Sequence, residues 1–239
     1  MTREVLAVWT PMSLSPLLWI VLTLGAYTAA QRVQRACRDT AFANPVLIAI
    51  LLVAGILLMT RTTYQTYFAG AQFINFLLGP ATVALAAPLA RNIRHVRATL
   101  PGVSLALIAG SIASIVGGVA LVWLLGGTRT VALSMAPKGV TTPIAMAVSG
   151  QIGGIPALTA AFAIIGGIVA AIIGRRLLMH LRINDDRAHG FAAGVAGSGV
   201  AAAQVASLGS LPAAFAALGI ALNGVLTALL APLVIHFWH

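Results

Sequence analysis

Long apolar runs separated by short polar stretches fill most of this 239-residue chain. Runs such as 45–59 and 103–126 contain no charged side chain. A helix that crosses a bilayer needs about 20 apolar residues, whereas the strands of a membrane barrel alternate apolar and polar residues. The pattern therefore predicts an all-α polytopic membrane protein with about seven or eight membrane segments.

The segments are predicted from the apolar runs, with boundaries good to a few residues. They are expected at 12–30, 45–60, 66–90, 99–125, 131–150, 156–177, 189–208 and 212–236. Four prolines lie near segment starts, where a missing N–H costs nothing. They are Pro45, Pro101, Pro156 and Pro212.

Arginines gather between these runs in three groups, at 32–38, 91–97 and 175–187. Such clusters are typical of cytoplasmic loops. Three segments separate the last two groups, and three full crossings would place them on opposite sides. One of the three is therefore expected to enter and leave on the same side. The segment 131–150 is the candidate, because Pro137, Gly139 and Pro143 interrupt it.

Two further segments show helix-breaking residues. Gly79-Pro80 interrupts the segment 66–90, and four glycines fall between 190 and 199. We expect one transmembrane domain, 1–239, built from two partly inverted repeats at 12–125 and 131–236 with broken or re-entrant helices. Interrupted helices at corresponding places in inverted halves indicate a transporter's midplane site. The alternative is that small residues only let helices pack closely, and we favour it for the glycines at 166, 167 and 174.

Composition narrows the class of protein. The chain is 60% hydrophobic and 8% charged, and its mean hydropathy is +1.01, so the bilayer is its expected solvent. The net charge of +10 comes from the loop arginines, and no nucleic-acid partner is expected. A single cysteine rules out an intramolecular disulfide. The sequence contains no nucleophile with a base, no metal-ligand spacing and no cofactor motif, so we expect neither enzyme activity nor a metal or cofactor.

The stretch 136–146 contains Lys138, the single lysine of the chain. Thr142-Pro143 is typical of a helix start, with Thr142 as the N-cap, and Gly79-Pro80 predicts a second start. Helix starts bind anions. The hydroxyls of Thr141, Thr142 and Thr82 and the amide of Asn75 would complete a site for a small carboxylate.

Two interpretations of Lys138 stay open. It lies about 10 Å into its segment at 1.5 Å per residue, from where it could snorkel to the surface. Alternatively it is embedded, and its anion comes from a solute. All four carboxylates, Glu4, Asp39, Asp185 and Asp186, fall in the N-terminus or loops, so no acidic side chain within the membrane is available to pair with it.

Other polar residues in the apolar segments have simpler expected roles. Asn223 is expected to make an interhelical hydrogen bond, and His189 to be a helix-end group. Ser198 and Gln204 are candidates for a cavity wall.

The chain resembles the LrgB/CidB family of bacterial membrane proteins over about 12–236. The resemblance rests on FLLGPATVALAAPLARN (76–92), PKGVTTPIAM (137–146), IGGIPALTA (152–160) and LNGVLTALLAPL (222–233). It implies a multi-pass protein of the bacterial cytoplasmic membrane, similar in fold to transporters with crossed broken helices. The substrate-site residues carried over are Gly79, Pro80, Thr82, Lys138, Thr141, Thr142 and Pro143.

The resemblance allows two functions. One is secondary transport of small monocarboxylates of the glycolate, glycerate, lactate or pyruvate type. The alternative is a holin-like or autolysis-regulating component that acts with a small LrgA/CidA-type partner. Packing as a homodimer is compatible with the apolar small-residue faces. This chain has Ser198, Ala202 and Gln204 where relatives have histidine, threonine and arginine, which implies a different solute or coupling.

Overall fold

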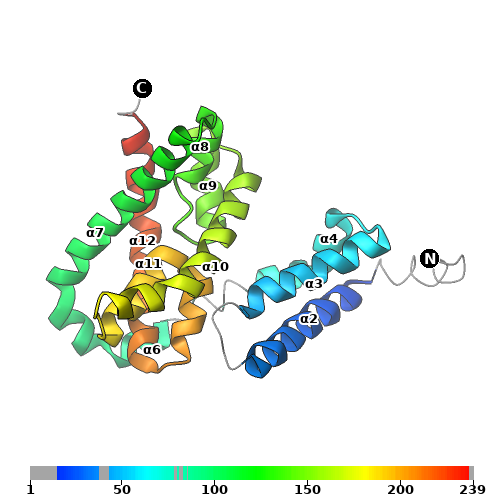
Figure 1. Cartoon of the computed structure of the whole chain (residues 1–239), viewed down its shortest axis with the longest axis horizontal. Coiled ribbons are helices and arrows are strands. Elements are labelled where there is room, and N and C mark those ends of the chain that lie inside the picture. The colour runs from blue at the N-terminus through cyan, green and yellow to red at the C-terminus, as the bar shows by residue number, and fades with distance from the viewer. Residues whose placement is uncertain (1–14, 38–42, 78–79, 81–82, 85, 237–239) are drawn as a thin grey trace, which may run out of the picture. The chain divides into compact units, whose positions relative to one another are not determined.

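The computed structural model describes residues 15–37, 43–77, 80, 83–84 and 86–236, and within them it is helical and contains no strand. The helices are α2 (Pro16–Ala36), α3 (Pro45–Thr60), α4 (Tyr64–Phe76), α6 (Ala86–Arg91), α7 (Ile93–Leu124), α8 (Arg129–Met135), α9 (Thr142–Ile152), α10 (Pro156–His180), α11 (Asp186–Ala206) and α12 (Ser210–His236). They are labelled in Figure 1. The chain divides into two compact units, Met1–Ala84 and Leu85–His239. We describe each unit by itself.

In the first unit, α2 packs on α3 and α4 around a buried aromatic residue. Trp19 of α2 has no exposed surface, and its ring meets Tyr67 of α4 edge to face with centroids 5.6 Å apart. Thr23 lies one turn further along α2 and its hydroxyl is 3.1 Å from that of Tyr67. Gly70 leaves room for the indole, because an added Cβ would lie 3.0 Å from the Trp19 Cγ. Aromatic packing and one polar contact therefore join α2 to α4.

Asn44 caps α3 and gives the first testable prediction. Its buried Oδ1 accepts hydrogen bonds from the N–H groups of Val46, at 2.9 Å, and Leu47, at 3.2 Å. Asn44→Ala should therefore lower the free energy of unfolding by about 1 kcal/mol, measured by thermal unfolding in detergent. Ser15 is the matched control, because it is the N-cap of α2 but makes no side-chain capping bond. Equal losses for Asn44→Ala and Ser15→Ala would contradict the assignment of the cap.

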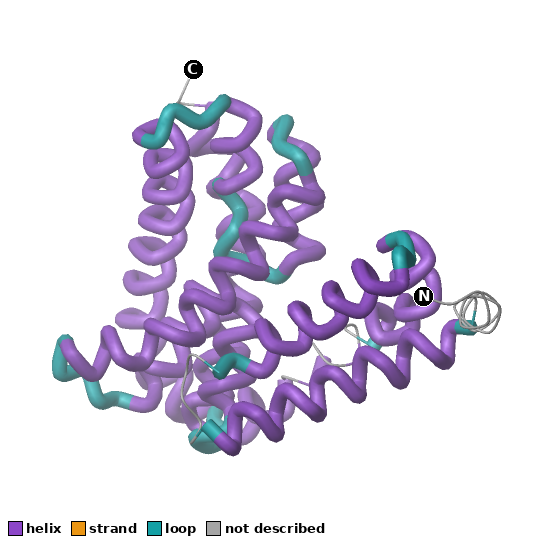
Figure 2. The backbone as a smooth tube through the Cα atoms, turned by 45° about the vertical axis from the view of Figure 1, so that its right-hand side comes forward, coloured by secondary structure: helices purple, strands orange, loops and turns teal. Residues whose placement is uncertain are grey.

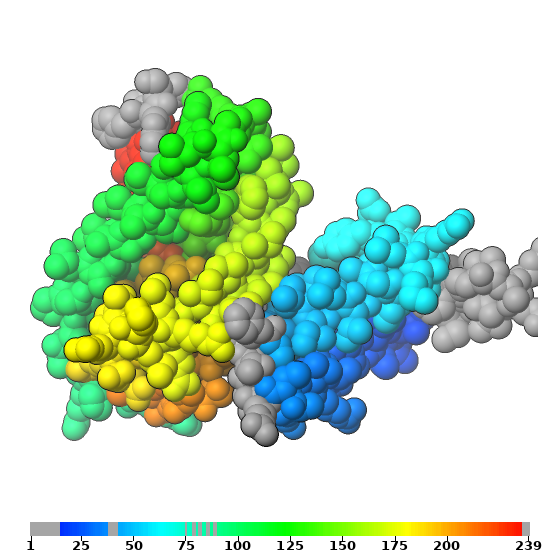
Figure 3. Space-filling view, in the orientation of Figure 1, coloured from blue at the N-terminus to red at the C-terminus, as the bar shows by residue number. Residues whose placement is uncertain are grey.

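Three helices of the second unit, α7, α10 and α12, are long and apolar enough to cross a membrane. The predicted runs 99–125, 156–177 and 212–236 correspond to them. Pro101 differs from its prediction as a segment start, because α7 begins at Ile93 and carries this proline inside the helix. The helix thus begins within the arginine-rich stretch that precedes Pro101. The proline costs it one backbone hydrogen bond. Figure 3 shows α7, α8 and α10 on the viewed face of this unit, with little of α12 visible.

The predicted segment 131–150 is broken into α8, a tight turn at 136–141 and α9. The two helices fold back on one another. Ser134, near the end of α8, accepts a hydrogen bond of 2.8 Å from the N–H of Ile155, which follows α9. Ser149 of α9 accepts one of 2.6 Å from Thr159 in the first turn of α10. These bonds form a helical hairpin, α8–α9, that starts from the end of α7 and leads into the start of α10.

The predicted segment 189–208 also differs from a single crossing helix, because α11 doubles back at Ser198. This residue has φ 47° and ψ −137° inside the helix. Gly190 and Gly194 of α11 lie against the backbones of Pro212 and Ala216 of α12, so the two helices start out parallel. A straight α11 would carry Ala206 about 24 Å beyond Gly190. The short connection at 207–209 spans about 14 Å at most, which does not reach back to α12.

The α11 break therefore forms a second helical hairpin. It starts where α10 ends and leads back to the start of α12. A hydrogen bond of 3.2 Å from Asn92 Nδ2 to the Ser210 carbonyl places the start of α7 at this same end. Asn92, the N-cap of α7, thus joins α7 to α12. Figure 1 shows α6 at this end and α8 with the C-terminal end of α12 at the other.

The two hairpins thus enter the second unit from opposite ends. Both arginine groups, 91–97 and 175–187, lie at the α6 end, as expected for loops that face the same side of a membrane. At that end Asp185 caps α11 and pairs with Arg187. The Arg187 side chain donates hydrogen bonds to the carboxylate, which holds the pKa of Asp185 below its usual range.

Candidate functional site

The tips of the two hairpins meet beside Asn223, the midpoint of α12. Asn223 Nδ2 donates one hydrogen bond of 3.0 Å to the Gly139 carbonyl in the α8–α9 turn and one of 2.9 Å to the Val195 carbonyl of α11. An added Cβ on Gly139 would lie 3.4 Å from that Val195 oxygen. The prediction that Asn223 makes interhelical hydrogen bonds is confirmed, and the bonds join two interrupted helices.

This meeting point lies deep in the unit. Asn223 is 13 residues from Ser210 and 13 from His236, the two ends of α12. At 1.5 Å per residue it is about 20 Å from each end. Gly167, which packs against the Gly197 carbonyl at the second hairpin, is similarly central in α10. The loop in teal between α8 and α9 lies within the helical unit in Figure 2.

Lys138 belongs to the first hairpin tip, and its side chain extends along α7. Its Nζ donates a hydrogen bond of 2.8 Å to the Ser114 carbonyl and one of 3.3 Å to the Ser114 hydroxyl. Gly118 makes room for the ammonium group, because an added Cβ would lie 2.9 Å from Nζ. The side chain is partly buried, and no acidic residue pairs with it in the part of the chain that the structure describes.

The helix start after Lys138 differs by one residue from the prediction. Thr141, with φ −58° and ψ 141°, is the N-cap of α9, Thr142 is its first residue and Pro143 the second. Helix ends commonly shift by a residue between pattern and structure. Both threonines are partly buried and Pro143 is exposed. Among the described residues, no hydrogen bond joins either threonine hydroxyl to Lys138, whose Nζ instead bonds to Ser114.

Ser198 stands at the fold of the second hairpin. It is 8% exposed, and its Oγ has no hydrogen-bond partner among the described residues. A buried hydroxyl without a partner is uncommon, since it costs about 1–3 kcal/mol. The helix breaks at this serine rather than at one of the four nearby glycines. Gly190, Gly194 and Gly197 instead serve as points of close helix contact.

The remaining predicted site residues lie in the first unit. Gly79 and Thr82 fall outside the described residues, as does the side chain of Asn75. Pro80 is helical and exposed. The parts these four residues play in binding remain predictions.

Several polar contacts in the second unit were not predicted from the sequence. Ser111, in α7, donates a hydrogen bond of 2.6 Å to Asn223 Oδ1. Ser114, one turn away, holds Lys138. A lone serine in an apolar helix is ambiguous, because its hydroxyl is as easily satisfied by its own backbone. The buried His189 is a helix-end group as expected, with Nε2 2.8 Å from the Ile183 carbonyl.

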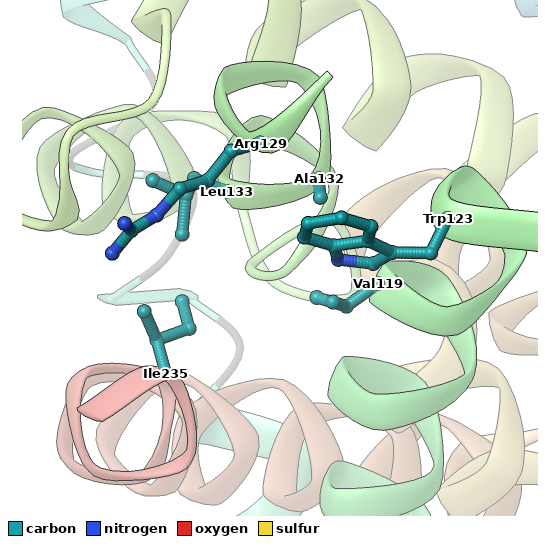
Figure 4. A pocket seen from close by; sticks show the side chains of 6 residues that line it. All are labelled: Val119, Trp123, Arg129, Ala132, Leu133 and Ile235. Carbon is teal, nitrogen blue, oxygen red and sulfur yellow. The ribbon is translucent and has the colours of Figure 1, made fainter. Parts of the chain in front are cut away.

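A small cavity lies at the α8 end of the unit, away from these contacts. Figure 4 shows side chains from α7, α8 and α12 around it. The lining residues are Val119, Trp123, Arg129, Ala132, Leu133 and Ile235. Its volume of about 20 Å³ is enough for one water molecule and too small for a carboxylic acid. We do not include it in the candidate site.

Comparison with known proteins places the chain among its relatives. The LrgB-like family matches residues 23–237. YxaC of Bacillus subtilis (strain 168) is 32% identical over 92% of this chain and 95% of its own length. Antiholin-like protein LrgB of Bacillus mycoides (strain KBAB4) is 29% identical over 94% and 98%. No solved structure matches the chain. The family match confirms the resemblance drawn from the motifs, and the long apolar helices agree with it: this chain is a membrane protein of the LrgB-like family.

Proposed function

We propose that the chain is an antiholin-like component of the bacterial cytoplasmic membrane that acts with a small LrgA/CidA-type membrane protein. The observation that supports this function best is its similarity to proteins named antiholin-like LrgB, which it matches over nearly their whole length. The arginine groups at one end of the second unit favour an orientation with that end in the cytoplasm. The apolar lengths of α7, α10 and α12 favour a multi-pass arrangement.

Membrane leakage in cells tests this function. The small partner is expressed alone and together with this chain, and the release of a small dye and of a cytoplasmic enzyme is followed over time. An antiholin-like component should reduce or delay the release that the partner causes. Identical release with and without this chain would count against the proposal.

A second function, a carrier of small monocarboxylates, has a specific structural observation in its favour. Lys138 holds an ammonium group at a hairpin tip, against Ser114 and Gly118 of α7, with no acidic partner among the described residues. On insertion scales a lysine within a membrane segment costs up to about 3 kcal/mol. Such a cost is common where a residue binds a solute or an ion.

The carrier would bind its solute between the two hairpin tips. Lys138 would supply the positive charge for a carboxylate, and the start of α9, with Thr141, Thr142 and Pro143, would supply N–H donors. Ser198 would contribute its hydroxyl from the second hairpin. Hairpins that enter from opposite ends would each close one route to the site, in keeping with alternating access. The solutes proposed are glycolate, glycerate, lactate and pyruvate.

Uptake into proteoliposomes separates the two functions. A carrier should take up radiolabelled glycolate, lactate or pyruvate with saturation and should retain an unrelated dye. A component that acts only on permeability should show no saturable uptake without its partner. Size-exclusion chromatography with light scattering in detergent would test the proposed homodimer in the same preparation.

A further inference from the structure

Neighbouring groups occupy every hydrogen-bonding position of the Asn223 amide, although α12 is mostly apolar. Its Nδ2 donates to the carbonyls of Gly139 and Val195, while Oδ1 accepts from Ser111 at 2.6 Å and from Thr227 at 3.2 Å. Two carbonyls can only accept and two hydroxyls are free to donate, so the orientation of the amide is determined by its surroundings. The residue is 1% exposed. All four hydrogen-bonding positions of the side chain are therefore satisfied in the interior.

Both carbonyls that Asn223 binds depend on the hairpin breaks. In an unbroken α11 the Val195 carbonyl would accept from the N–H of Gly199, but the chain turns at Ser198. Gly139 lies in the turn between α8 and α9, outside any helix. A buried carbonyl needs a partner. One side chain on α12 supplies partners for the carbonyls at both breaks.

The two hydrogen bonds that the Asn223 amide donates fix the distance between the two hairpin tips. The N–H bonds of a planar amide diverge by about 120°, so the two acceptor oxygens are held about 5 Å apart. Lys138 directly precedes Gly139, and Ser198 lies one helical turn after Val195. The amide thus controls the separation between the charged residue of one hairpin and the unpartnered hydroxyl of the other.

We propose that Asn223 is a positioning residue that holds the Lys138 turn and the Ser198 break in register, so that both hairpins face the same solute. This inference rests on the carrier function proposed above. Asn223 touches no solute in this proposal. Asn223 acts through the two carbonyl groups to which it donates hydrogen bonds. Its loss should therefore weaken solute binding more than it lowers the maximal rate of transport.

The experiment measures uptake of one monocarboxylate into proteoliposomes by Asn223→Ala. We expect KM to rise about tenfold or more, the effect of one or two lost hydrogen bonds in a buried site, with a smaller change in maximal rate. Thr227→Val is the matched control, because it removes a bond to the same amide but none to a hairpin. Its KM should stay within about twofold of the wild type. A purely structural residue would lower the yield of folded protein and leave the KM of the folded fraction unchanged.

Gly139→Ala disturbs the same contact from the hairpin side. It is the second test variant, for use if Asn223→Ala does not fold. The added Cβ would lie 2.9 Å from the Ser114 hydroxyl and 3.4 Å from the Val195 carbonyl, so it presses the tips apart without removing the amide. KM should again rise several-fold. If the wild type takes up solute and a folded variant of either kind keeps the wild-type KM, the proposal for Asn223 is wrong and the carrier function stands. No saturable uptake by the wild type would instead overturn the carrier function.

Discussion

Gly194→Val should prevent the chain from reaching its folded state. An added Cβ at Gly194 would lie 3.0 Å from the Ala216 carbonyl carbon and 3.1 Å from its Cα, and closer still to the carbonyl oxygen. These are backbone atoms of the neighbouring helix, which cannot rotate away as a side chain can. Ordinary overpacking costs about 1–3 kcal/mol, and separating α11 from α12 would also break the Asn223 bond to Val195. We expect loss of monodisperse protein in fluorescence-detected size-exclusion chromatography.

Gly166 is the matched control for this prediction. It lies inside α10, and a Cβ added there meets nothing within 4 Å. Gly166→Val should give a monodisperse peak like that of the wild type. Close packing of α11 on α12 would be disproved by a folded Gly194→Val protein with the wild-type melting temperature.

If the chain is the proposed carrier, Lys138→Ala should strongly reduce solute uptake while leaving the protein at least as stable. The Ser114 carbonyl that loses the ammonium group can still accept its ordinary bond within α7. Lys138 lies in the turn between α8 and α9, and on insertion scales a lysine within a membrane segment costs up to about 3 kcal/mol. Removing one member of a buried charge pair, here with the solute, costs about 2–5 kcal/mol. Uptake should therefore fall at least about thirtyfold in proteoliposomes, with an unchanged or higher melting temperature.

Arg94→Ala provides the control for charge. Arg94 is an exposed cation at the start of α7, outside the apolar part of the helix, and its loss should leave uptake unchanged. Lys138→Arg should not restore uptake, because the ammonium group lies close to the Gly118 backbone and a planar guanidinium group is larger and binds with a different geometry. Saturable uptake by Lys138→Ala at the wild-type rate would remove the lysine from the mechanism.

The apolar runs predicted most of the helices, because a bilayer accepts few other patterns. Pro137, Gly139 and Pro143 correctly marked the break between α8 and α9, since each disfavours a continuous helix. The parity of the arginine groups predicted that this segment starts and ends at the same end. Both deductions use residues with one strong preference. Proline and glycine disfavour a continuous helix, and arginine favours cytoplasmic loops.

The second hairpin was not predictable in the same way. The four glycines between 190 and 199 predicted that this segment is interrupted, but the break itself falls at Ser198, which has no strong preference for positive φ. Their role is decided by what lies opposite, as with Gly194 and the Ala216 backbone. The partners of Lys138 and Asn223 were hidden for a similar reason. Nothing in the sequence distinguishes Ser111 and Ser114 as partners, because only tertiary packing brings the hairpin tips to α7.

Both proposed sites for Lys138 and Ser198 require the two hairpins to enter from opposite ends, and side-specific cysteine labelling tests this arrangement. Cys37 is first replaced by serine, and single cysteines are placed at Ile183, Leu208, Leu125 and Ile155, which are all exposed. A membrane-impermeant maleimide is added to intact cells and to inverted vesicles. If the hairpins enter from opposite ends, positions 183 and 208 should react from one side and positions 125 and 155 from the other. Labelling of 183 and 208 from opposite sides would mean that α11 crosses the membrane, and would contradict this arrangement.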